Sequence, residues 1–195
     1  MLYPVNLDLR GQACLVVGGG EVAARKVASL LKCGAKVTLV SLRFDPSVKK
    51  LFKKKKLQAI RRSFRSGDLK GQFLVIAATD DRALNSRISH LARRRRILVN
   101  AVDQPADCVF TVPSVMRRGP LTIAVSTNGA SPALSKQIRL ELSHRYGPEF
   151  GQFLKRMALA RRELLRRIPS TKQRKHHFET MVKAFFKKRD KKWGV

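Results

Sequence analysis

The sequence predicts an α/β protein in which a doubly wound parallel sheet is followed by a small α+β segment and a helical carboxyl-terminal region. Two observations carry this prediction. Strands that are almost entirely apolar alternate with helical segments through the first half of the chain, which is typical of a parallel sheet covered by helices on both faces. After about residue 108 the pattern changes to two short strands and then helices. We expect domains at 1–112, 113–147 and 148–195.

The sheet domain is expected to contain five strands and three helices. Gly34 ends the first helix as a left-handed cap, and Asp45-Pro46 supplies the N-cap and the first-turn proline of the second. Right-handed crossovers between the strands then give the doubly wound arrangement. The expected strands are 13–18, 35–41, 57–62, 73–81 and 97–103, and the expected helices are 21–32, 46–55 and a third that ends near Arg95.

The segment 113–147 is expected to form a hairpin and a helix. The hairpin strands are "VFTVPSV" (109–115) and "LTIAVST" (121–127), with a turn at Gly119-Pro120 between them. Ser131-Pro132 then supplies an N-cap and a first-turn proline for a helix that reaches about residue 146. Because so small a segment is unlikely to bury a core of its own, it is predicted to be a dimerisation segment.

Two further helices are expected at 149–168 and 173–189. The second of them has apolar residues at the i, i+3, i+4, i+7 and i+8 positions of one face, a pattern that favours packing within the protein over a binding surface. These residues are Phe178, Met181, Val182, Phe185 and Phe186.

Composition restricts the class of protein. A length of 195 residues with 44% hydrophobic content fits one globular core, and no apolar run approaches the roughly 18 residues of a membrane span. The amino-terminal sequence shows no secretory signal. Cys14, Cys33 and Cys108 lie far apart, and an odd cysteine count without an export signal indicates free thiols in a reducing cytoplasm. The four histidines form no convincing metal constellation, so no metal ligand is predicted.

The chain is strongly basic. It has 42 Lys+Arg against 13 Asp+Glu, a formal net charge of +29, with runs at 49–56 ("KKLFKKKK") and 93–96 ("RRRR") and a basic carboxyl-terminal third. Such a charge would attract nucleic acid, anionic lipid or a polyanionic small molecule. The simpler interpretation, which we favour for the charge as a whole, is that the runs are solvated helix faces.

A glycine-rich turn gives the sheet domain its first functional prediction. The stretch from Gly18 to Ala23 matches G-x-G-x-x-G/A directly after an apolar strand and at the start of a helix. Gly18 permits the tight turn, Gly20 lets the backbone approach a pyrophosphate, and the N–H groups at the helix start can bind the phosphate. We therefore predict a Rossmann-type dinucleotide-binding domain.

The second strand leaves the identity of the dinucleotide open. It ends in Val40-Ser41-Leu42-Arg43, without the Asp or Glu that binds the adenosine ribose in many NAD-binding domains. Ser41 could hydrogen-bond a ribose hydroxyl, whereas Arg43 could accommodate a 2′-phosphate. The residues thus allow either NAD or NADP.

Polar residues lie at the carboxyl ends of the later strands, where ligands bind in open α/β sheets. Thr79 and Asp80 follow "LVIAA", Asn100 lies within "LVNAVD", and Asp103 comes just beyond it. Asp80 could equally cap the next helix. Asp103 could accept a proton during hydride chemistry, the alternative being that it braces the "DQPAD" turn. We assign Thr79 to the cofactor site and Asn100 to the substrate site.

Several of these segments together resemble precorrin-2 dehydrogenase, the module that stands alone or forms the amino-terminal part of siroheme synthase. The resemblance runs from about residue 4 to residue 146. It rests on "PVNLDLRGQACLVVGGGEVAARKVASLL", "IAATDDRALNSRIS" and "ILVNAVDQPADCVFTVPSVMRRGPLTIAVSTNGASPALSKQIR". It implies a homodimer that oxidises precorrin-2 to sirohydrochlorin and passes a hydride to NAD⁺. In some members of the family Fe²⁺ is then inserted.

The resemblance also implies roles for individual residues. Asp103 corresponds to the aspartate of the family's N-x-x-D segment and would be catalytic. Ser131, in "SPALS", would lie beside the tetrapyrrole. The residues along the cofactor would be Gly18, Gly20, Glu21 and Val22, with Leu42 and Arg43 near its adenosine end.

A second class of function is a dinucleotide sensor without catalytic activity, whose basic tail contacts nucleic acid. The glycine turn and the tail are compatible with it, but the "NAVD" and "NGASPALS" segments are not explained by it. Precorrin-2 carries eight carboxylates, so a basic cleft would attract it, although 42 basic residues exceed what one such anion requires. We therefore favour the enzyme, predict no membrane partner, and do not expect nucleic acid as a partner.

Overall fold

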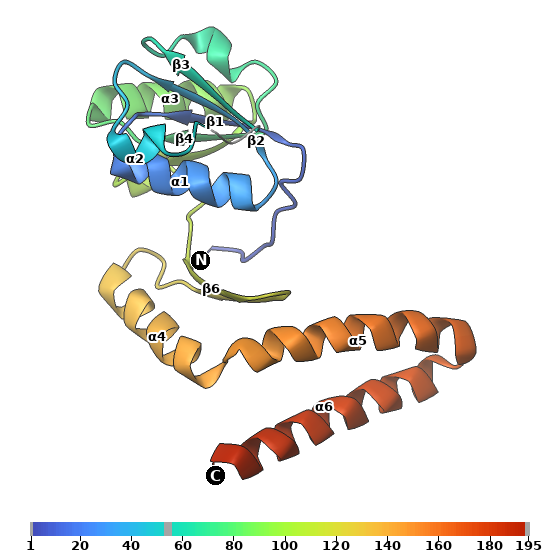
Figure 1. Cartoon of the computed structure of the whole chain (residues 1–195). Coiled ribbons are helices and arrows are strands. Elements are labelled where there is room, and N and C mark those ends of the chain that lie inside the picture. Colours follow the sequence, from blue (N-terminus) through green and yellow to red (C-terminus); the bar gives the residue numbers. More distant parts are fainter. Residues whose placement is uncertain (1, 53–55, 194–195) are drawn as a thin grey trace. The chain divides into compact units, whose positions relative to one another are not determined.

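The computed structural model describes residues 2–52 and 56–193, and the chain divides into two compact units at residues 1–112 and 113–195 (Figure 1). The first unit contains the sheet, and the second contains the hairpin and three helices. In the described residues no helix is long and apolar enough to cross a membrane. Part of the basic run at 49–56, residues 53–55, lies outside the described residues, as does the end of the helix predicted for 46–55.

The first unit is a five-stranded parallel sheet with the strand order β3-β2-β1-β4-β5. Residue Val16 in the central strand pairs with Leu39 on one side and with Ile76 on the other. This order, with the chain running outward in both directions from β1, is the predicted doubly wound arrangement. The strands are β1 (Ala13–Val17), β2 (Lys36–Ser41), β3 (Leu57–Arg61), β4 (Leu74–Ala77) and β5 (Leu98–Ala101).

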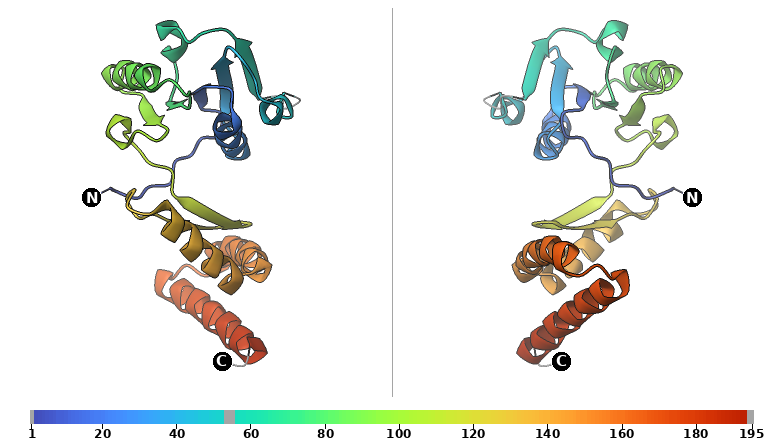
Figure 2. Two further views of the ribbon diagram at one scale, coloured as in Figure 1. Left: turned by 90° about the vertical axis from the view of Figure 1, so that its left-hand side faces the viewer. Right: turned by 90° about the vertical axis from the view of Figure 1, so that its right-hand side faces the viewer.

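Helices cover both faces of the sheet, because β1 alternates its side chains between two apolar cores. Cys14 and Val16 point into a core with α1 (Glu21–Lys32) and α2 (Pro46–Lys49), whereas Leu15 and Val17 point into a core with α3 (Arg82–Arg94). The views of Figure 2 show α1 and α3 on opposite sides of the strands.

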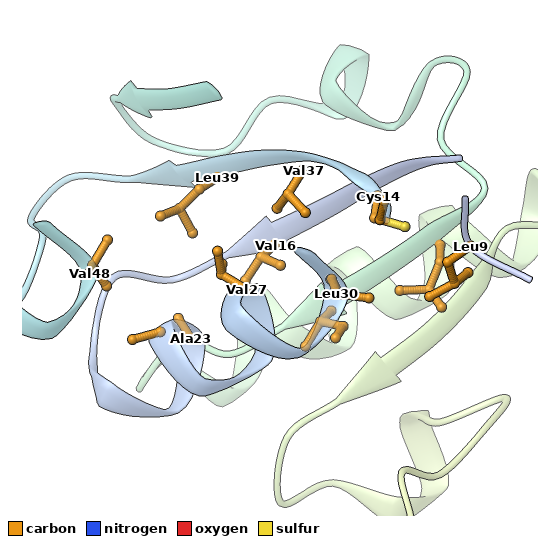
Figure 3. Close-up of a cluster of buried hydrophobic side chains, with 13 residues drawn as sticks. Leu9, Cys14, Val16, Ala23, Val27, Leu30, Val37, Leu39 and Val48 are labelled. Atoms are coloured by element: carbon orange, nitrogen blue, oxygen red, sulfur yellow. The ribbon is translucent and has the colours of Figure 1, made fainter. Parts of the chain in front are cut away.

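The core beneath α1 holds the glycine turn at the end of β1 in place (Figure 3). Ala23 and Val27 of α1 are fully buried against Val16, and Val48 of α2 is buried beside Leu39. Burying each larger aliphatic side chain contributes about 1.5–3 kcal/mol. The helix that begins at the glycine turn is therefore fixed along its length by packing.

Most boundaries in the first unit agree with the predictions to within two residues, and the ends of α2 and β4 differ by more. Helix α2 is a single turn that ends at Lys49, where the sequence predicted a helix to 55. Strand β4 ends at Ala77, and the rest of the predicted segment 73–81 leads into α3 with the Thr79 side chain bonded to Asn85. The cap of α3 is Asp81, which accepts a hydrogen bond of 3.0 Å from the N–H of Leu84, so the suggested capping role of Asp80 was wrong.

The second unit begins with an antiparallel ribbon of β6 (Ser114–Arg118) and β7 (Leu121–Val125), joined at Gly119 with φ +58°. Strand β6 begins later than the predicted 109. In the first unit, the N–H of Val109 donates to the carbonyl of Val99, and the carbonyl of Phe110 accepts from Asn100. Residues 109 and 110 are therefore hydrogen-bonded to β5 and do not pair with β7. The remaining elements are α4 (Pro132–Arg145), α5 (Pro148–Arg167) and α6 (Thr171–Trp193).

Helices α5 and α6 form a hairpin held by aromatic rings (Figure 2). Phe185 of α6 stacks on Phe153 of α5 with ring centroids 4.1 Å apart, and it also meets the edge of Phe150 at 5.1 Å. The Arg189 guanidinium lies 4.6 Å from the centre of the Phe186 ring. Residues Phe185 and Phe186 of the predicted apolar stripe therefore pack within the protein.

Candidate active site

A cavity of about 660 Å³ opens in the first unit at the carboxyl ends of the strands. We call it the glycine-turn cavity, because the turn at Gly18–Gly20 forms part of its wall. It lies beside β1, where the strand order switches from one side of the sheet to the other. Ligands usually bind at this position in doubly wound sheets. The predicted site residues on its wall are Gly18, Gly20, Glu21, Val22, Ser41, Leu42, Thr79 and Asp103.

Three consecutive glycines have three different reasons to be glycine. Gly18 has φ +124°, and a side chain there would overlap the carbonyl oxygen of Ala78. At Gly19 a Cβ would overlap the carbonyl oxygen of Arg43 and lie 2.6 Å from the hydroxyl of Ser41. At Gly20 a Cβ would meet no atom within 4 Å, so the backbone there faces open space.

The turn is fixed by backbone hydrogen bonds to its neighbours. The N–H of Gly18 donates to Val40 at 3.0 Å, and the carbonyl of Gly19 accepts from the N–H of Asp45 at 2.8 Å. Gly20 precedes α1, whose first N–H groups receive no side-chain cap from any described residue. An open backbone at a helix start, on a cavity wall, fits the pyrophosphate of a dinucleotide. The motif alone left out Gly19, where close contact with the segment after β2 excludes any side chain.

The segment after β2 is held by its own hydrogen bonds. The Ser41 hydroxyl donates to the carbonyl of Arg43 at 2.7 Å, and Arg61 Nε donates to the carbonyl of Leu42 at 3.2 Å. Leu42 is 63% exposed and lies on the cavity wall. Arg43 is not among the described residues that form this wall, so its contact with the cofactor stays a prediction.

The cation on this side of the cavity is Arg62, just after β3, which sequence reasoning missed. Its guanidinium pairs with Asp68 through two hydrogen bonds of 2.6 and 2.8 Å. Asp68 also accepts the N–H of Arg65 at 2.8 Å. The Arg62 guanidinium, together with this N–H, holds the pKa of Asp68 below its ordinary value of 3.8. The charge of Arg62 is thus largely neutralised inside the protein.

This ion pair predicts a pH-dependent stability. Asp68→Asn will lower the melting temperature by about 3 °C at pH 7, or about 1 kcal/mol, because Asn removes the charge-assisted bonds to Arg62. The folded pKa lies below 3.8, so this contribution is complete at neutral pH and is lost as the pH falls below that value. The drop in melting temperature caused by Asp68→Asn should therefore be larger in thermal melts at pH 7 than at pH 3. Asp8→Asn, in an exposed pair with Arg10, is the control and should change little at either pH.

The turn after β4 is built around a buried amide. Asn85 is 1% exposed, its Nδ2 donates to the carbonyl of Thr79 at 2.9 Å, and its Oδ1 lies 2.8 Å from the Thr79 hydroxyl. Thr79 is therefore fixed on the cavity wall by a residue of α3. Asn85 lies in "RALNSR", and its polar character at a buried helix position was the signal that sequence reasoning could have used.

Asp103 lies two residues beyond β5, exposed on the cavity wall, with φ +58°. The structure thus brings the predicted acid and the glycine turn to one cavity. Lys26 of α1 lies in the same electrostatic neighbourhood: burial lowers the pKa of its ammonium group, Arg25 lowers it further, and Cys108 and Asp103 act in the opposite direction.

Two predicted substrate residues are placed elsewhere. Asn100 is 8% exposed, and its amide donates to the carbonyl of Phe110 at 3.0 Å and to Cys108 Sγ at 3.4 Å. It supports the segment that follows Asp103 and does not belong to the described wall of the cavity. Ser131 belongs to the second unit, where its hydroxyl accepts the N–H of Leu134 at 3.2 Å as the predicted N-cap of α4. Contacts of either residue with a substrate stay predictions.

The wall of the glycine-turn cavity carries more acidic than basic residues. Four of the 13 acidic residues lie on its wall, namely Glu21, Asp80, Asp81 and Asp103, together with Arg62 and Arg82. Among residues 2–52 and 56–193, no group of three or more His, Cys, Asp or Glu is arranged to hold a metal ion. The large positive charge of the chain is therefore not concentrated on this wall.

Comparisons with known proteins identify both units. Residues 5–114 match the family model described as putative NAD(P)-binding, and residues 118–145 match the model described as sirohaem biosynthesis protein central. Among solved structures, SirC, a precorrin-2 dehydrogenase, is similar with a TM-score of 0.75 and 33% identity. That match covers 93% of this chain and 89% of the other.

Curated relatives extend the same comparison. The siroheme synthase of Nitrosococcus oceani is 38% identical over 181 residues, which are 93% of this chain and 39% of the relative. The siroheme synthase of Methylococcus capsulatus is 39% identical over 181 residues, which are 93% and 38% of the two chains. This chain therefore spans about two fifths of the length of these relatives.

Proposed function

Because the chain belongs to the family of NAD(P)-binding proteins that includes the precorrin-2 dehydrogenase SirC, we propose that it oxidises precorrin-2 to sirohydrochlorin with NAD⁺ as the acceptor. One observation carries the proposal within the structure. Asp103 and the open backbone of Gly20 lie on the wall of one cavity, at the carboxyl ends of the parallel strands. A group that accepts a proton and a cradle for a dinucleotide are the two parts that such an oxidation requires.

The residues of this chain would divide the work as follows. A bound NAD⁺ supplies the hydride acceptor. The N–H groups at the start of α1 and the backbone of Gly20 bind its pyrophosphate, and Ser41 and Leu42 line the adenosine side. The oxidation of the tetrapyrrole also releases a proton, and Asp103 accepts it at its carboxylate and passes it to water.

The same wall supports NAD over NADP. The guanidinium of Arg62 already binds Asp68 through two hydrogen bonds, so a 2′-phosphate would meet a cation whose charge is satisfied. Ser41 lies on the wall at the end of β2, and its hydroxyl, which already donates to the Arg43 carbonyl, could accept a hydrogen bond from a ribose hydroxyl.

The decisive test is an assay with precorrin-2 and either NAD⁺ or NADP⁺. We expect NADH absorbance and the spectrum of sirohydrochlorin, with kcat/KM at least tenfold higher for NAD⁺, a preference of about 1.4 kcal/mol. Folded protein that produces neither signal would refute the proposed oxidation. A preference for NADP⁺ would refute only the argument from Arg62 and would leave the proposed oxidation standing.

We further propose a cytoplasmic homodimer that forms through the second unit. A two-stranded ribbon such as β6–β7 is rarely stable alone, and α4 exposes Leu134 and Leu140 at 52% and 37%. Sedimentation equilibrium should give twice the chain mass of 22.0 kDa. Insertion of Fe²⁺ stays a prediction from the family resemblance, and incubating sirohydrochlorin with Fe²⁺ tests it.

A dinucleotide sensor that binds nucleic acid is the weaker alternative. It would use the glycine turn and the basic tail, but it gives no reason for residues 118–145 to match the sirohaem biosynthesis model. Its binding to DNA would fall steeply with salt. Sequence-specific binding that survives physiological salt would favour it.

A further inference from the structure

We propose that a polar stripe on α3 positions the loop that carries Asp103, with Gln104 as the central positioning residue. This inference rests on the proposed function, because it concerns how the proton acceptor is held. The stripe consists of the Arg82 carbonyl and the side chains of Ser86, Ser89 and Arg93, and the loop is the segment 102–108.

The stripe follows from helical geometry. The spacings from 82 to 86, 89 and 93 are four, three and four residues, which place these positions within about 60° of one another on a helix. The stripe borders the buried face of α3, and its member Ser89 is itself buried, as are the neighbouring Asn85 and Ala92. Hydrogen-bonding groups along about three turns of α3 thus face the loop.

Gln104 directly follows Asp103 and connects the loop to the stripe. It is 8% exposed, and its Nε2 lies 2.9 Å from Ser86 Oγ, 2.9 Å from Asp107 Oδ2 and 3.2 Å from the Arg82 carbonyl oxygen. The Ser86 hydroxyl in turn donates to Asp107 Oδ2 at 2.6 Å. The three side chains form a closed set of hydrogen bonds, and Gln104 itself lies on the cavity wall next to Asp103.

The far end of the loop is held by the next two turns of the stripe. The Ser89 hydroxyl donates to the carbonyl of Asp107 at 2.6 Å. Arg93 Nη2 donates to the carbonyls of Ala106 and Cys108 at 2.8 and 3.1 Å. Arg93 is the first residue of the "RRRR" run, so part of that basic run serves the loop.

Two features indicate that this arrangement is more than ordinary packing. Asp103 has a backbone in the left-handed region at φ +58°, which Asp adopts more readily than most residues with a side chain and which the hydrogen bonds of the loop help to hold. Gln104 Oε1 is buried with no hydrogen-bond partner among the described residues. The hydrogen bonds of the Gln104 side chain among the described residues are therefore those of Nε2, to Ser86, Asp107 and the Arg82 carbonyl.

The test replaces Gln104 with Leu, which fills similar space and donates no hydrogen bond. We expect kcat for precorrin-2 oxidation to fall about 10- to 100-fold, because a carboxylate displaced by a fraction of an ångström transfers protons poorly. The dissociation constant for NAD⁺, measured by fluorescence titration without substrate, should change less than about twofold, since the glycine turn is untouched. Amide hydrogen exchange in the segment 102–108 should become faster.

The double variant with Asp103→Asn separates positioning from general destabilisation. If Gln104 acts through Asp103, adding Gln104→Leu to Asp103→Asn lowers kcat no further, whereas independent effects would multiply. Gln72→Leu is the matched control, because Gln72 also has a buried Oε1 without a partner among the described residues and lies outside the described wall of the glycine-turn cavity. It should leave kcat unchanged.

The outcomes distinguish this inference from the proposed function. An inactive wild-type protein would refute the oxidation itself. An active wild type with an equally active Gln104→Leu variant, or losses that multiply in the double variant, would refute the positioning role. Should Gln104→Leu fail to fold, Ser86→Ala removes one of the same hydrogen bonds with a smaller change, and an unaltered kcat in a folded Ser86→Ala protein would also refute it.

Discussion

Replacing Asp103 with Asn will lower kcat for precorrin-2 oxidation by about 10²- to 10⁴-fold, the usual contribution of a proton acceptor. The dissociation constant for NAD⁺ should stay within about twofold, because Asp103 lies beyond β5 and the cofactor cradle is built by the turn after β1. Steady-state kinetics and a binding titration on the same preparation measure the two quantities.

Asn is the informative replacement, since the backbone at this position has φ +58°. Asn tolerates the left-handed region far better than Ala, so Asp103→Asn removes the proton acceptor without adding backbone strain. Asp107→Asn is not a suitable control, because Asp107 accepts bonds from Ser86 and Gln104. Asp80→Asn, on the same cavity wall, is suitable and should retain most activity. Full activity of Asp103→Asn would remove Asp103 from the mechanism.

Adding a methyl group at Gly20 will weaken NAD⁺ binding by at least about tenfold while the protein remains folded. The Cβ would enter open space at an ordinary φ of −85°, so it disturbs nothing in the protein itself. The melting temperature should fall by no more than about 3 °C, since Ala caps a helix slightly less well than Gly. If a pyrophosphate lies against this backbone, the methyl group occupies its place.

The neighbouring position gives the opposite result and completes the test. Gly19→Ala should destabilise the protein by about 1–3 kcal/mol, because its Cβ would overlap the carbonyl oxygen of Arg43. Gly67→Ala is the matched control for Gly20→Ala, as its Cβ would also meet nothing within 4 Å and it lies outside the described cavity wall. Unchanged NAD⁺ affinity in Gly20→Ala would mean that the dinucleotide does not bind along this turn.

The sequence predicted the parts of the fold that depend on local pattern. Apolar strands, the cap at Gly34 and the start of α1 at Glu21 follow from periodicity and from the conformational needs of single residues, and the structure confirms them. The glycine turn was also visible, because its chemistry lies within six consecutive residues.

The parts that were missed depend on contacts between distant residues. The partner of Arg62 is six residues away, Gln104 meets Ser86 across 18 residues, and Arg93 reaches the carbonyl of Cys108 across 15. No periodicity records such pairs. The start of β6 was predicted too early for the same reason: apolar residues at 109–113 favour a strand, whereas Val109 and Phe110 hydrogen-bond to residues of β5. Helix α2 is shorter than predicted because the chain after Lys49 continues in local turns up to Phe52, the last described residue before 53–55.

The ring stack between α5 and α6 limits how far the chain can be shortened. Phe153 and Phe185 are 32 positions apart in sequence, yet their faces meet at 4.1 Å. A truncation that stops before Phe185 would leave Phe153 without the ring stacked on it and Phe150 with Tyr146 as its remaining aromatic partner, and would expose both rings to water. Expression of any trimmed version should therefore retain the chain through Phe186, or the product will tend to aggregate.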